Sequence, residues 1–248
     1  MGITIDYKFK AGPCDEAGAR SLVYKLRQRA LDLPFLEVGE IREFGPGEIS
    51  PFRFPRKSPD TLLHLQAIAT AERQEGDRCD EVFLLVPSRL FVFSAIPGPG
   101  AGIGFFGLGV YHDHIKDCGE SADSHVENQA PPKLERWSWQ GDCKTQFALS
   151  DKHGGMPNFL RTHMTLVKLL DFAKELGILA KVSDEGGYWD NRSFASLAAE
   201  AMVLNLFIGA FSGAAGCELV SKMLEHIAKE HPELGPFGPV KEVEIEDR

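Results

Sequence analysis

The chain has 248 residues, of which 43% are hydrophobic and 25% are charged, as in a soluble globular protein with a substantial core. Its formal net charge of −9 argues against a nucleic-acid partner, because affinity for phosphates comes from Lys and Arg. Residues 1–10 lack the basic and apolar regions of a signal peptide, and five scattered cysteines predict reduced thiols. We therefore expect a cytoplasmic protein.

The first part of the chain predicts two strands and two helices. Alternating apolar and polar residues predict a strand over 3–10, and apolar residues spaced by three and four predict a helix over 15–33. A second strand is expected over 35–44. Ser58 is a suitable N-cap for a helix that reaches about Arg73.

The middle of the chain predicts more strand. Two apolar runs, Glu81–Val86 and Leu90–Ile96, predict a hairpin in the centre of a sheet, and a glycine-rich strand is expected over 103–111. Residues 112–135 predict a long polar loop. Gly102–Gly107 fits G-x-G-x-x-G, but the residues after it alternate like a strand, so we reject a dinucleotide site.

The last part predicts a strand over 137–148, a helix over 157–176 closed by Gly177, and a short strand over 178–183. A final helical region is expected from Asp190 or Asn191 to about residue 231. Its apolar stretch 201–217 lacks flanking basic residues and is interpreted as a buried helix, so no membrane is expected.

These elements predict an α+β fold: a mixed or mostly antiparallel sheet of about six strands, with helices chiefly on one face. The segments 3–44 and 137–183 share the order strand–helix–strand, which places both helices on one side if they join one sheet. We expect a single domain over 1–248, with pseudo-duplicated halves 1–111 and 136–248 as the alternative.

The other side of that sheet is expected to be polar. A polar row there predicts either a solvated surface or a binding surface. The row consists of Thr4, Asp6, Lys8, Gln140, Asp142, Lys144 and Gln146.

Three stretches together resemble those of a group of uncharacterised bacterial proteins. They are Met1-Gly-Ile-Thr-Ile5, Lys144-Thr-Gln-Phe-Ala148 and Asp184-Glu-Gly-Gly-Tyr-Trp189, with a helix that carries His163 between the last two. The resemblance covers the first strand and about 143–197. It implies a shared scaffold and nothing about substrate.

The segment after the glycine-rich strand is the richest in metal ligands. His112 and His114 form H-x-H, which can place two imidazoles on one side of an extended strand. The spacing to further ligands matches no known zinc pattern, so a hydrophilic loop is the other interpretation. We expect no cofactor, with zinc or another divalent metal at this loop as the alternative.

The second candidate is the turn that begins with Asp184 and Glu185. Adjacent carboxylates before Gly-Gly could bind a cation or act as a base, and Tyr188 and Trp189 could stack on a ligand, but the same residues are typical of a plain tight turn. His163 lies on the apolar stripe of its helix, where a histidine is usually a core residue. If its side chain reaches Asp184 or Glu185, a base and its orienting carboxylate would be formed.

These patterns are compatible with two functions. The first is a non-enzymatic protein that binds a small molecule or another protein through the polar sheet face and the adjoining turn. Its expected binding residues are Lys144, Gln146, His163, Asp184, Glu185, Tyr188 and Trp189.

The second is a metal-dependent hydrolase built on His112 and His114. No catalytic signature decides whether the chain is an enzyme. Gly209 and Gly213 form G-x-x-x-G, which permits close helix approach, so a homo-oligomer is left open.

Overall fold

The structure is a computed structural model that describes residues 2–50, 60–75, 78–111, 113–116 and 134–211. The chain divides into two compact units, one spanning Gly2–Leu197 and one that begins at Ala198. The described part of the second unit is the continuation of helix α5 (Phe194–Phe211). None of the helices in the described ranges is long and apolar enough to span a bilayer. The single domain over 1–248 and its two halves stay predictions.

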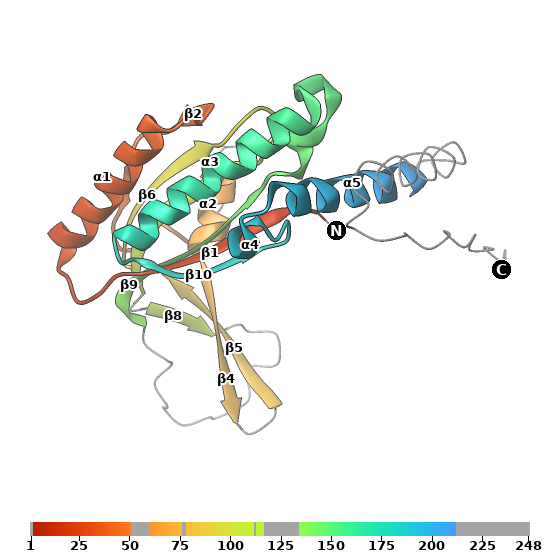
Figure 1. Cartoon of the computed structure of the whole chain (residues 1–248). Coiled ribbons are helices and arrows are strands. Elements are labelled where there is room, and N and C mark those ends of the chain that lie inside the picture. The colour runs from red at the N-terminus through yellow and green to blue at the C-terminus, as the bar shows by residue number, and fades with distance from the viewer. Residues whose placement is uncertain (1, 51–59, 76–77, 112, 117–133, 212–248) are drawn as a thin grey trace. The chain divides into compact units, whose positions relative to one another are not determined.

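The predicted α+β class is confirmed. A seven-stranded open sheet has the order β10-β1-β9-β7-β6-β2, with β3 also on β6, and all its pairings are antiparallel (Figure 1). The predicted strand 35–44 forms two short strands instead of one. The strands are β1 (Thr4–Lys10), β2 (Glu37–Val38), β3 (Arg42–Phe44), β6 (Arg89–Ile96), β7 (Gly104–Tyr111), β9 (Leu134–Lys144) and β10 (Leu179–Asp184).

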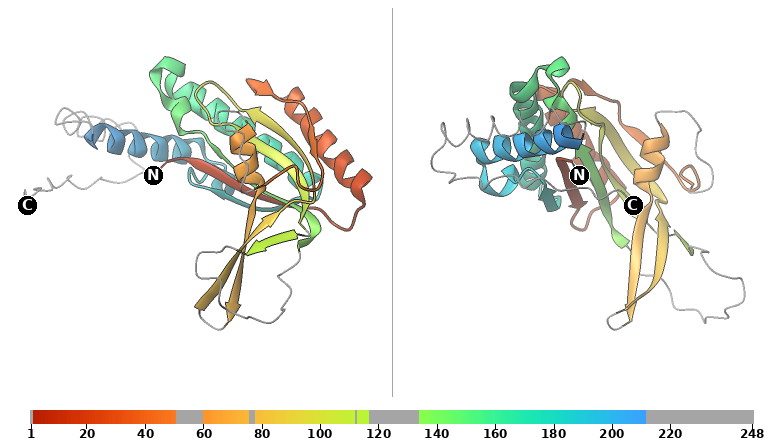
Figure 2. Two further views of the ribbon diagram at one scale, coloured as in Figure 1. Left: turned by 180° about the vertical axis from the view of Figure 1, so that it is seen from behind. Right: turned by 90° about the vertical axis from the view of Figure 1, so that its right-hand side faces the viewer.

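Two long helices, α1 (Glu16–Asp32) and α3 (Gly155–Glu175), cover the same face of this sheet (Figures 1 and 2). Each connects two strands that run parallel, β1 to β2 and β9 to β10, and the preferred hand of such connections puts both helices on one side. Asp15 begins α1 by accepting a hydrogen bond from the N–H of Gly18 at 2.8 Å. Gly177, with φ +72°, lets the chain leave α3.

Between the sheet and these helices lies an aromatic core. Tyr7 is 1% exposed and its ring stacks on that of Phe106 with centroids 5.0 Å apart. The Tyr7 hydroxyl and the Trp139 indole N–H both donate to the carbonyl oxygen of Phe105, at 2.8 and 2.7 Å. Each buried polar tip therefore has a partner, so these aromatic rings bury their surface without an unsatisfied donor.

A second, three-stranded sheet has the order β4-β5-β8. It overturns the predicted hairpin over 81–96, because the two runs belong to different sheets: Val86 pairs with Asp113 in the small sheet and Arg89 with Val110 in the large one. Between them, the N–H and hydroxyl of Ser88 both donate to the carbonyl oxygen of Val110, which turns the chain. The strands are β4 (Ala69–Glu75), β5 (Arg78–Val86) and β8 (Asp113–Lys116).

The same sheet changes two further predictions. The helix expected to reach Arg73 is the shorter α2 (Asp60–Ala67), because the residues after it pair with β5 as strand β4. Figure 2 shows α2 on the face of the large sheet opposite α1 and α3. The long loop expected over 112–135 contains β8, its last two residues belong to β9, and 117–133 lies outside the described residues.

The end of β9 also differs from the prediction. The strand stops at Lys144, because the N–H groups of Thr145 and Gln146 both donate to the carbonyl oxygen of Ile3 and the chain enters a short 3-10 helix, η1 (Gln146–Leu149). The turn of η1 ends the alternation of buried and exposed side chains that β9 follows. Gln146 is therefore buried at 8% exposure while Phe147 is 56% exposed, and Gln146 does not lie on the polar sheet face.

The last helix begins later than the sequence predicts. Residues Tyr188–Asn191 form the one-turn helix α4, and α5 begins only after Ser193, whose hydroxyl accepts from the N–H of Ser196 at 3.2 Å. A capping residue between the two helices satisfies the first N–H groups of α5, which explains the delay. Gly213, the helix beyond Phe211 and the tail 240–248 lie outside the described residues.

Gly141 tests how tightly the core is packed. A Cβ at this position would lie 2.7 Å from the Tyr7 ring, which cannot shift because it is stacked and hydrogen-bonded. We expect Gly141→Ala to lower the free energy of unfolding by about 1–3 kcal/mol, measured by urea denaturation. Gly12→Ala is the control, since a Cβ there meets nothing within 4 Å. Equal midpoints for the two variants would contradict this packing.

Candidate functional site

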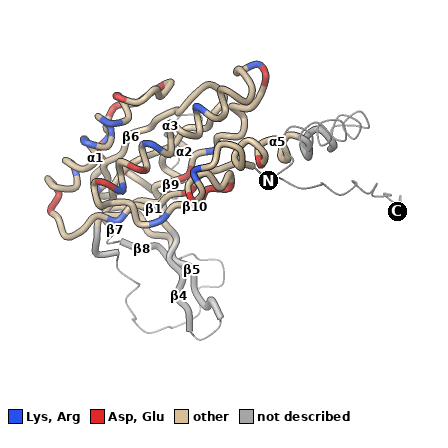
Figure 3. Tube along the Cα trace, viewed as in Figure 1, with Lys and Arg blue, Asp and Glu red and all other residues tan. Residues whose placement is uncertain are grey.

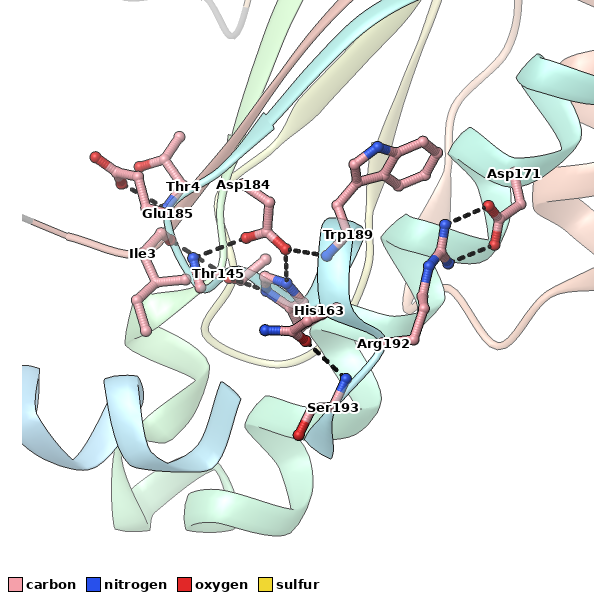
Figure 4. A network of polar contacts seen from close by, with 12 residues as sticks. Ile3, Thr4, Thr145, His163, Asp171, Asp184, Glu185, Trp189, Arg192 and Ser193 are labelled. Carbon is pink, nitrogen blue, oxygen red and sulfur yellow. Dashed lines mark hydrogen bonds and ion pairs between the residues drawn. The ribbon is translucent and has the colours of Figure 1, made fainter. Parts of the chain in front are cut away.

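The predicted histidine is the centre of a buried polar network (Figure 4). His163 Nε2 lies 3.1 Å from Oδ2 of Asp184, and His163 Nδ1 lies 3.0 Å from the hydroxyl oxygen of Thr145. That hydroxyl also contacts the carbonyl oxygen of Ile3 at 3.3 Å. The network thus joins α3, the end of β10, the end of β9 and the residue before β1.

Asp184 is held by the turn after it. The N–H of Gly186 donates to Oδ1 and the N–H of Trp189 to Oδ2, both at 2.8 Å. Burial alone would raise the pKa of Asp184, but the hydrogen bond and charge of His163, then the two backbone N–H groups, lower it below its ordinary value of 3.8. The carboxyl is therefore ionised at neutral pH, and His163 Nε2 must carry the proton between them.

The Thr145 hydroxyl, the His163 imidazole and the Asp184 carboxylate are connected in the same way as the groups of a nucleophilic triad. The side chains of His163 and Asp184 are both 0% exposed, however, and so is Thr145. The ring of Phe159 and the edge of Tyr188 pack against the imidazole. A substrate has no access to the Thr145 hydroxyl in this arrangement, so the network is a structural tie in the conformation described.

The other predicted turn residues serve the turn itself. The Glu185 carboxylate is exposed and accepts from the N–H of Thr4 at 2.8 Å. Tyr188 is 9% exposed, and the centroid of the Trp189 ring lies 4.6 Å from the guanidinium carbon of Arg192. Tyr188 is thus part of the core, whereas the Glu185 carboxylate stays exposed at the turn.

The polar face of the sheet is exposed along β1 and β9. We use this name for the side that carries Thr4, Asp6, Lys8, Gln140, Asp142 and Lys144, all of which are exposed or half-buried. Positively and negatively charged residues both lie around β1, β9 and β10 (Figure 3). Lys144, the predicted binding residue on this face, has its ammonium 5.9 Å from the Phe147 ring.

Where α2 meets the polar face there is a pocket of about 190 Å³, which we call the Asp6–Asp142 pocket. Asp6 and Asp142 are directly paired across β1 and β9, and Gln66 of α2 donates to Oδ1 of Asp142 at 2.8 Å. Partial burial raises the pKa of Asp6, and the negative charges of Asp142 and Glu185 raise it further. Gln140, Ile68, Ala69 and Tyr111 complete most of the wall.

Tyr111 is the most buried polar residue of this pocket. It is 3% exposed, and its hydroxyl has no hydrogen-bond partner among the described residues. Burial raises the pKa of Tyr111 well above its ordinary value, so the phenol stays protonated. The pocket therefore holds two carboxylates and one neutral hydroxyl that is free to accept or donate a hydrogen bond.

The predicted metal ligands His112 and His114 are not tested by the described residues. His112 lies outside the described residues, and of His114 the structure describes only the backbone, in β8. Within the described ranges, no group of three His, Cys, Asp or Glu side chains is arranged to hold a metal ion. A metal at this loop stays a prediction.

Three residues of these two sites carry little signal in the sequence. Alternation over 137–148 places Thr145 on a strand face, and its position just after the last strand residue is visible only once β9 is seen to end. Gln66 and Tyr111 resemble ordinary helix and strand residues, and they line one pocket only because α2 packs against β7 and β9. No local pattern marks them.

No protein-family model, curated protein or solved structure matches this chain. The resemblance to the bacterial group therefore stays a prediction. Only the geometry of the described residues bears on function.

Loss of the central imidazole tests the structural tie. His163→Ala leaves Asp184 ionised and buried without its side-chain donor, and we expect it to lower the free energy of unfolding by about 3–5 kcal/mol. Lys168→Ala, at an exposed position of the same helix, is the control and should change it by less than about 0.5 kcal/mol. Chemical denaturation of both variants is the measurement, and similar midpoints would rule out the tie.

The lowered pKa of Asp184 makes a second prediction, on the pH dependence of stability. A carboxyl whose pKa is lower in the folded state contributes stability above its ordinary pKa of 3.8, and this stability is lost as pH falls through the folded value. Below pH 3.8 we expect the wild-type chain to lose stability more steeply than Asp184→Asn. Asp32→Asn, which removes an exposed carboxylate of α1, should keep the wild-type slope. Denaturant titrations at stepwise lower pH give the slopes, and a wild-type slope in Asp184→Asn would contradict the assignment.

Proposed function

We propose that this chain is a non-enzymatic α+β protein that binds a ligand on the polar face of its large sheet. The observation that carries the proposal is the Asp6–Asp142 pocket, because it combines an open volume with polar groups on three strands and a helix. Concave sites in which several polar groups converge are the usual binding sites for small molecules.

The state of His163 supports a binding role over a catalytic one. A general base must lie within hydrogen-bond reach of its substrate, and this imidazole is 0% exposed with both ring nitrogens already in contact with the protein. Cys143 is also a poor nucleophile, since burial, with the charge of Asp142, raises its pKa to about 12.

A cytoplasmic location is part of the proposal. Cys14 and Cys143 are free thiols in the described structure, as expected for a reducing compartment.

The proposal is tested by a fragment screen followed through backbone amide NMR signals. A library of neutral, anionic and cationic fragments should contain members that shift the amides of Asp6, Gln140 and Asp142. Ala69→Phe fills the pocket and should abolish these shifts, whereas Thr4→Phe, on the same polar face outside the pocket lining, should keep them. Absence of any such fragment, or shifts that survive Ala69→Phe, would contradict binding at this pocket.

The hydrolase alternative has its own distinguishing result. Stoichiometric zinc in protein purified without chelator, lost on His112→Ala, would overturn the non-enzymatic proposal in favour of a metal site at the H-x-H loop.

A further inference from the structure

We propose that the ligand of the Asp6–Asp142 pocket is a small organic cation, an aliphatic amine in its ammonium form. This inference rests on the proposed function and names the chemistry of the ligand at that site. It is drawn from the paired carboxylates, the buried tyrosine beside them and the apolar part of the wall.

The two carboxylates are the first reason. Asp6 and Asp142 face each other across an antiparallel pair, where Cβ atoms are about 5 Å apart and like charges are destabilising. Lysines share the polar face, yet neither carboxylate has an ion-pair partner among the described residues, and the one contact of the Asp142 side chain is with the neutral Gln66. A bound cation would relieve the repulsion of both groups at once.

The second reason is Tyr111, and it is independent of the acidic pair. A side chain that is almost fully buried and has no hydrogen bond within the protein can offer its hydroxyl to a ligand. Tyr111 lines the pocket at 3% exposure, and its hydroxyl has no partner in the part of the chain that the structure describes. Its oxygen can accept an N–H from an ammonium group, which has three donors and no acceptor.

The third reason separates an organic cation from a bare metal ion. The pocket of about 190 Å³ exceeds a cavity of about 150 Å³ that admits a benzene-sized molecule. Ile68, Ala69 and the Tyr111 ring give part of the wall an apolar character suited to a short carbon chain. Two carboxylates alone fall short of the six to eight oxygen ligands that calcium takes.

Butylammonium chloride, titrated against the full chain and followed by amide NMR, tests the inference, with 1-butanol as the neutral probe of similar shape. We expect butylammonium to shift the signals of Asp6, Gln140 and Asp142 in a saturable way and 1-butanol to leave them unchanged. Asp142→Asn should weaken butylammonium binding by about tenfold, the effect of one charge-assisted hydrogen bond. Tyr111→Phe should weaken it by a smaller factor.

Asp151→Asn is the matched control, because it removes one exposed negative charge outside the pocket and should leave butylammonium binding unchanged. Equal binding of 1-butanol, or no binding of butylammonium, would overturn the inference. So would saturable binding of calcium or magnesium chloride at the same amides without binding of the amine. If one of these results is found and a neutral, anionic or metal ligand still shifts the pocket amides, the proposed binding function stands without the amine. If the fragment screen finds no ligand at the pocket, the proposed function and the amine inference both fail.

Discussion

The contact between the His163 imidazole and the Asp184 carboxylate stabilises the junction at which β1, β9, β10 and α3 meet. A carboxylate with no exposed side-chain surface is stable only when its oxygens are satisfied, and here the imidazole and two backbone N–H groups do so. Those N–H groups belong to the turn after β10, so the ionised carboxylate fixes the turn as well as the helix. Thr145 extends the tie to the residue before β1.

The His163–Asp184 contact determines which polar groups a ligand can reach. By sealing the histidine, it leaves the opposite side of the same strands as the accessible polar surface. The period of two along β1 places Ile5 and Tyr7 in the core and Asp6 outside, so one strand separates the buried network from the Asp6–Asp142 pocket. A rigid strand pair is a suitable floor for a binding site, since its backbone is fixed by ladder hydrogen bonds and its side chains start from fixed positions.

The pocket itself holds features that folding alone does not favour. Two like charges are paired across strands, and the hydroxyl of a buried tyrosine lacks a partner among the described residues. The paired like charges lower the stability of the free protein, and a cation removes that cost when it binds. That balance, rather than any sequence motif, is the reason to look for a cation at this position.

The sequence by itself determined the elements whose signal is local. Alternation in β1, the apolar stripe of α1, and Gly177 after α3 each act over a few residues, and each was predicted correctly. The polar face was predicted for the same reason, because alternate residues of a strand point to opposite sides of the sheet. Tertiary structure decided what depends on partners distant in the chain. The bond from Gln146 to Ile3 ended β9 and buried Gln146, pairing with β5 turned the expected helix end into β4, and β5 and β6 entered different sheets. His163 meets Asp184, and Tyr111 comes to line the same pocket as Asp6, only after the strands are ordered, because both arrangements depend on sheet order and register, which no single segment encodes.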